Sequence, residues 1–90
     1  MKFGEIIRDA RLKKQLTYRA MADKLDNIIS SAYINAIELH DEIPSPDTVM
    51  HLAEVLELNA DELLEIAKQV KINEFNSLMN KKYRGRKKWT

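Results

Sequence analysis

Histidine and cysteine are the residues that most often carry chemistry in a short chain, and their pattern here offers little of it. His40 and His51 are eleven residues apart, so they do not share one face of a helix, and the chain has no cysteine. There is also no glycine-rich phosphate loop and no HExxH zinc motif. We therefore expect a protein that is not an enzyme, without catalytic residues, cofactor, metal ion or small-molecule substrate.

Basic side chains remain as groups that could act on a ligand, and they are unevenly distributed. The net charge is only +1, yet residues 1–25 hold seven Lys or Arg against three acids, whereas residues 38–66 hold nine acids and no Lys or Arg. A third segment, residues 81–90, is basic and holds no acid, and a basic arm of this kind can neutralise DNA phosphates or remain a solvated tail. Its candidate DNA-binding residues are Lys81, Lys82, Arg84, Arg86, Lys87 and Lys88.

The elements that must position these side chains are predicted to be helices. Glycine and proline are rare, and apolar residues recur every three or four positions. The pattern predicts an all-α fold of five helices, the first over about residues 2–14 and the third ending near Leu39. Thr17, Ser30–Ser31 and Asn59 offer caps for helices two, three and five, and Pro46 suits the first position of helix four.

The end of the chain carries further apolar residues beyond the predicted core. We expect a domain over residues 1–68 and a helical extension with a basic tail over residues 69–90, where the step at residues 71–73 can interrupt the fifth helix. The apolar residues of this extension predict either a homodimer interface or a segment folded back onto the core. They are Val70, Ile72, Phe75, Leu78 and Met79. No apolar run suits a signal peptide or membrane span, so we expect a cytoplasmic protein without a membrane partner.

A set of these residues matches a known motif. It comprises Ile7–Arg8 and Arg11, Leu16–Thr17, Met21–Ala22 and Leu25, the run from Ser31 to Glu38, and Pro46 before Leu52–Ala53 and Leu56. On these residues the chain, over residues 3–67, resembles the helix-turn-helix family of phage repressors and Cro proteins. The resemblance implies a five-helix domain whose third helix lies in the major groove while the second crosses the DNA backbone. It therefore implies a sequence-specific regulator of transcription that binds double-stranded DNA, a repressor acting as a homodimer.

The resemblance also assigns roles to individual residues. Thr17, Tyr18 and Arg19 would contact phosphates, and Ser30 would cap the third helix with or without touching a phosphate as well. Arg11 and Glu38 would form a structural ion pair between the first and third helices. The residues that would face base edges are Ser31, Ala32, Tyr33, Asn35 and Ala36, among which Asn35 could offer adenine both a donor and an acceptor and Tyr33 could instead pack against the turn.

Three features depart from the family pattern. The turn between Leu25 and Ser30 is longer by about two residues, Tyr18 stands where glutamine is usual, and the loop over residues 39–43 is acidic where a basic loop with glycine is common. Acids beside phosphates lower DNA affinity. The acidic residues between 38 and 66 favour an alternative, in which the same scaffold is a protein-interaction module, an antitoxin or antirepressor, with a protein partner.

Overall fold

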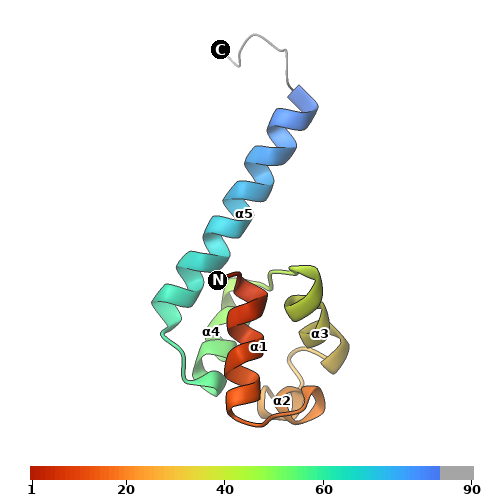
Figure 1. The fold of residues 1–90 in the computed structure, drawn as a ribbon, viewed down its shortest axis with the longest axis vertical. Helices are drawn as coiled ribbons and strands as arrows, with labels where there is room; N and C mark the ends of the chain where they lie inside the picture. The colour runs from red at the N-terminus through yellow and green to blue at the C-terminus, as the bar shows by residue number, and fades with distance from the viewer. Residues whose placement is uncertain (84–90) are drawn as a thin grey trace.

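Five helices make up the chain in the computed structural model, which describes residues 1–83 and contains no strand within them. They are α1 (Phe3–Lys13), α2 (Tyr18–Lys24), α3 (Ser31–His40), α4 (Pro46–Leu56) and α5 (Ala60–Tyr83). Figure 1 shows α1 to α4 grouped together, while the second half of α5 projects away from them. The predicted all-α class is thus confirmed for the described residues. The predicted phosphate contacts of Arg84, Arg86, Lys87 and Lys88 lie outside them.

The helices begin at the predicted capping residues. Thr17, Ser30 and Asn59 each accept a hydrogen bond from the backbone amide three residues later, at 3.0, 3.1 and 2.9 Å. Ser45 caps α4 in the same way at 3.4 Å, and Pro46 occupies the first helical position, where its missing amide has no partner to lose. These caps satisfy backbone donors that the helix itself cannot, so the predicted helix starts are confirmed.

The core is apolar and collects side chains from every helix. Ile7 of α1, Met21 of α2, Ile34 of α3 and Leu52 of α4 are all fully buried, and Leu63 of α5 is 2% exposed. Each such side chain contributes roughly 1.5–3 kcal/mol by leaving water. Because α3 is packed against α1 and α2 on one side only, its opposite side faces outward.

Gly4 sets how closely α1 and α3 approach. A Cβ atom at this position would lie 2.5 Å from the carbonyl oxygen of Ile37 and 2.9 Å from that of Glu38. These are backbone atoms that cannot rotate away, so any larger residue would force the two helices apart. Gly4 therefore fixes the position of α3 relative to α1.

The last helix differs from the prediction in one respect. α5 runs unbroken from Ala60 to Tyr83, so the possible interruption at residues 71–73 does not occur. No glycine or proline lies within this range, and Lys71 and Glu74 form an exposed ion pair of 3.9 Å along the helix. Of the apolar residues in the extension, Val70 packs against the core, whereas Ile72, Phe75 and Leu78 are exposed, so the alternative in which the extension folds back onto the core is wrong beyond Val70. Within residues 1–83, no helix has the length and apolar character needed to span a bilayer.

Candidate nucleic-acid interface

A buried ion pair joins α1 to α3. The Arg11 guanidinium donates from Nε to Glu38 Oε2 at 2.7 Å and from Nη2 to Glu38 Oε1 at 3.1 Å. The Arg11 side chain is 9% exposed and the Glu38 side chain is completely buried. The hydrogen bond to Glu38 raises the pKa of Arg11, so the guanidinium stays charged wherever the fold persists. Two parallel hydrogen bonds fix the rotation of α3 as well as its distance from α1.

Leu16 and Tyr18 complete the surroundings of this pair. Arg11 donates from Nη1 to the carbonyl oxygen of Leu16 at 2.7 Å, which ties the segment before α2 to α1. The Tyr18 hydroxyl donates to Glu38 Oε1 at 3.2 Å, and Arg11 Cζ lies 4.3 Å from the centre of the Tyr18 ring. The family resemblance implies a phosphate contact for Tyr18 and no contact for Leu16 beyond its place in the motif. The only signal for a different role was that Tyr18 departs from the glutamine usual in the family.

The outer side of α3 carries the residues expected to face DNA bases. Ile34, Ile37 and Glu38 are buried and hold the inner side of the helix. Ala32 is exposed, and a further four residues of the outer side are partly exposed. These four are Ser31, Tyr33, Asn35 and Ala36. The Tyr33 ring also packs partly against the core, so this side chain is held in place rather than standing in solvent.

The turn before α3 contains two consecutive residues in the left-handed conformation. Asp26 and Asn27 have φ values of 53° and 58°. The Asn27 amide donates to the carbonyl oxygen of Ala22 at 2.9 Å, which closes the end of α2. Asn and Asp tolerate this conformation better than other residues with a side chain, so the long turn is compatible with an ordered path into α3.

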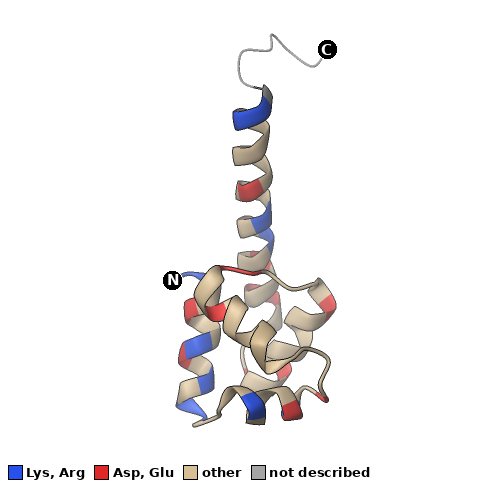
Figure 2. Cartoon of the chain, turned by 90° about the vertical axis from the view of Figure 1, so that its right-hand side faces the viewer, with Lys and Arg blue, Asp and Glu red and all other residues tan. Residues whose placement is uncertain are grey.

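Charge on the described surface is divided between helices. Figure 2 looks onto α3 and shows both basic and acidic residues on α1 and α2 beside it, and α3 itself contains no Lys or Arg. Thr17 and Arg19, at the start of α2, are exposed, whereas the loop after α3 presents the exposed acids Asp41 and Glu42. Asp41 caps α3 with a φ of 57°, which is a left-handed conformation. The surface around α3 therefore carries charges of both signs on the α2 side, where Arg19 and Lys24 lie near Asp23, and is acidic at the carboxyl end of α3.

An exposed ion pair lies away from α3. Lys14 Nζ donates to Glu57 Oε2 at 2.7 Å and joins the end of α1 to the residue after α4. This hydrogen bond lowers the pKa of Glu57. Since both groups are open to solvent, this ion pair contributes little to the free energy of unfolding.

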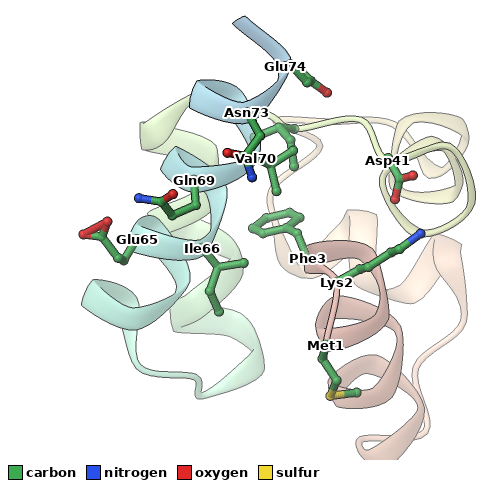
Figure 3. Close-up of a pocket in the computed structure, with 11 residues that line it drawn as sticks. Met1, Lys2, Phe3, Asp41, Glu65, Ile66, Gln69, Val70, Asn73 and Glu74 are labelled. Atoms are coloured by element: carbon green, nitrogen blue, oxygen red, sulfur yellow. The ribbon is translucent and has the colours of Figure 1, made fainter. Parts of the chain in front are cut away.

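A pocket of about 470 Å³ lies between the start of α1, the loop after α3 and α5. Figure 3 shows that the Phe3 ring and Val70 point into this space, while Glu65 and Glu74 point away from it. Its lining contains no histidine, and no group of three or more potential metal ligands occurs within residues 1–83. The pocket is a gap along the apolar junction of α1 and α5.

Comparison with known proteins gives one match. A family model described as a helix-turn-helix domain matches residues 4–67, which is more than half of the chain. No curated protein and no solved structure matches it. The matched residues end within α5, before the exposed part of that helix begins.

Proposed function

Because the chain belongs to the helix-turn-helix domain family, we propose that it is a sequence-specific regulator of transcription that binds double-stranded DNA. Within that family we assign it to the phage-repressor type, acting as a homodimer that represses by occupying its site and performing no catalysis. The observation that carries the proposal is the outward side of α3. Ile34, Ile37 and Glu38 hold that helix from behind, so its other side is available to a major groove.

The proposed base contacts come from the outer side of α3. Asn35 is suited to adenine, because its amide nitrogen can donate to adenine N7 while its amide oxygen accepts from the adenine N6 amino group. Ala32 and Ala36 are suited to the methyl group of thymine. Ser31 and Tyr33 complete this surface with hydroxyl groups that can donate or accept.

The proposed phosphate contacts surround α3. Thr17, which caps α2, and Arg19 on α2 are both exposed, and Ser30 keeps its hydroxyl proton available while its oxygen caps α3. The Tyr18 hydroxyl donates to Glu38, so we assign Tyr18 to the Arg11–Glu38 ion pair and not to a phosphate. Lys81 and Lys82 belong to the extension of residues 69–90, which we regard as an addition to a DNA-binding unit of residues 1–68.

A binding experiment with matched variants tests the assignment. Affinity for the DNA upstream of the gene that encodes this chain is measured against random DNA at several salt concentrations. In the variant with Tyr33→Ala and Asn35→Ala we expect the preference for the specific site to fall, since each good bidentate base contact contributes about 1–3 kcal/mol of discrimination.

Asn76→Ala is the matched control, because it removes the same amide from an exposed position on α5. We expect this variant to keep the affinity and preference of the unaltered chain. An unaltered chain that binds all sequences equally, at every salt concentration, would contradict sequence-specific recognition.

A second candidate function rests on the acidic surface. Glu54, Asp61, Glu62 and Glu65 are exposed on α4 and α5, and no Lys or Arg lies between residues 38 and 66. A basic protein surface complements such a region better than DNA does. In this reading the chain is an antitoxin or antirepressor. It predicts that the variant with Glu54→Gln and Glu62→Gln keeps DNA affinity but loses affinity for a basic protein partner.

A further inference from the structure

The second half of α5 has no packing partner within the described chain. From Lys71 to Lys82 every side chain except Met79 is exposed, and Figure 1 shows this half projecting beyond α1 to α4. The molecule is 51 Å long, against 24 and 22 Å in the other two directions. A helix of this kind obtains most of its stability from packing an apolar face rather than from its own hydrogen bonds.

An apolar stripe runs along this projecting half. Ile72, Phe75 and Met79 follow one another at spacings of three and four residues, which places them on one face of the helix. Leu78 flanks them on the next turn. Phe75 is 61% exposed and Leu78 is 50% exposed, so the stripe presents large apolar side chains to solvent.

A cavity continues this stripe at its base. Its volume is about 510 Å³, and it lies between α5 and the start of α4, with Pro44, Val49 and Leu64 in its lining. Lys68 and Lys71 also line it, and they precede Ile72 and Phe75 by one helical turn. The cavity therefore lies directly beside the base of the stripe, with Lys68 and Lys71 at the junction.

The opposite flank of α5 does not have this character. The pocket of Figure 3 continues along α5 into a shallower one whose lining includes Asn73, Ser77 and Lys81. Val70 and Leu78 also line this pocket, and its other lining residues are polar or charged. Because Ile72, Phe75 and Met79 all lie on the first flank, that flank is the more apolar of the two, and burial against a partner favours it.

The charges of α5 indicate how a second α5 would lie on that flank. The helix begins with Asp61, Glu62 and Glu65 and ends with Lys81 and Lys82. A parallel pair would set acids beside acids and lysines beside lysines, whereas an antiparallel pair sets each acidic end beside a basic end. Antiparallel helices also align their dipoles favourably.

We infer that a second copy of this chain covers the apolar stripe, with its α5 antiparallel to the first. The inference rests on the homodimer in the proposed function and supplies its interface. When Ile72 faces Phe75 of the second copy, the same register brings Glu65 opposite the second copy's Lys82. It also brings Lys68, which lines the cavity, opposite the second copy's Met79. The flexible Met79 side chain of the second copy then fills the cavity.

The molecular mass in solution tests whether the stripe forms the interface. At tens of micromolar, sedimentation of the full chain should give twice the monomer mass of 10.5 kDa, and Phe75→Asp should give the monomer mass. Ser77→Asp is the matched control, because it adds the same charge to the opposite flank and should stay dimeric. Circular dichroism of each variant checks that the helices persist. A monomeric unaltered chain, or a dimeric Phe75→Asp variant, would overturn the inference.

Single cysteines test the antiparallel direction, since the chain has no cysteine of its own. Chains with Glu65→Cys and chains with Lys82→Cys are oxidised separately and as a mixture. A disulfide requires Cβ atoms about 3.5–4.5 Å apart, so we expect cross-linking between the two variants in the mixture and none in either variant alone. Cross-linking of each variant with itself, or no cross-linking in the mixture, would overturn this arrangement.

Neither measurement contains DNA, so the interface and the proposed function can fail separately. A dimer with the expected cross-link that binds no DNA would contradict the regulator and leave the interface supported. A monomer that still prefers one DNA sequence would contradict the interface and leave sequence recognition supported.

Discussion

Arg11 and Glu38 are both buried, and each neutralises the charge of the other. Arg11→Ala leaves the fully buried Glu38 carboxylate without its guanidinium, and we expect a loss of about 3–5 kcal/mol in the free energy of unfolding. Arg11→Lys should recover only part of this, because an ammonium cannot supply two parallel hydrogen bonds. Urea denaturation measures both variants.

The control for this prediction lies in the same helix. Lys14→Ala breaks the exposed ion pair with Glu57 and should change the urea midpoint little, since exposed pairs contribute little to stability. If Arg11→Ala were no more destabilising than Lys14→Ala, the buried pair would not be what holds α3 to α1.

Tyr18 offers a test between two roles for one hydroxyl. Tyr18→Phe keeps the ring beside Arg11 and removes only the hydrogen bond to Glu38. We expect unfolding to become easier by about 1 kcal/mol, with DNA affinity unchanged. Thermal unfolding and a DNA titration of the same preparation measure the two effects. A fall in DNA affinity without loss of stability would show that the hydroxyl serves a phosphate.

At the scale of elements, Asp41 at the end of α3 is unfavourable in two ways, one for the stability of the fold and one for DNA binding. Its φ of 57° is a conformation that glycine adopts without cost, and its carboxylate lies at the carboxyl end of the proposed recognition helix. Asp41→Gly should therefore stabilise the fold by up to about 1 kcal/mol and raise DNA affinity, because it removes both the strain and the charge.

Asp41→Asn separates these two effects. Asparagine keeps a side chain that tolerates the left-handed conformation and removes only the charge. We expect it to raise DNA affinity as much as glycine does, with a smaller gain in stability. If neither variant changed DNA affinity at low salt, the loop after α3 would lie away from the phosphates.

The elements also show what local sequence can predict. Thr17, Ser30 and Asn59 marked helix starts because capping depends on residues three positions apart. The approach of α1 to α3 at Gly4 could not be predicted, since it depends on backbone atoms more than thirty positions away along the chain. The hydrogen bond from Tyr18 to Glu38 could not be predicted either, because the two residues are distant in the sequence and no local signal links them. The placement of α3 against α1 is a property of tertiary contacts.

At the scale of the whole molecule, charge is separated along the chain. Residues 1–80 hold nine Lys or Arg against fourteen acids, so their net charge is −5, and the positive total comes from the last ten residues. The continuity of α5 carries Lys81 and Lys82 to the far end of the projecting helix. Local periodicity predicted the apolar side chains of α5, whereas the direction in which it leaves the domain followed from its unbroken backbone.

Because the basic residues of the tail are separated from the domain, their contribution to DNA binding can be measured by removing them. A chain that ends at Tyr83 keeps α5 and loses Arg84, Arg86, Lys87 and Lys88. If all four neutralise phosphates in both chains of the proposed homodimer, the slope of log affinity against log salt concentration becomes shallower by up to about 7, at roughly 0.9 per phosphate. A full-length chain with Gln at these four positions should show the same change, because it keeps the length and removes only the charge. Sequence preference should persist in both variants, as it depends on α3. An unchanged slope in the shortened chain would show that these four residues make no phosphate contact.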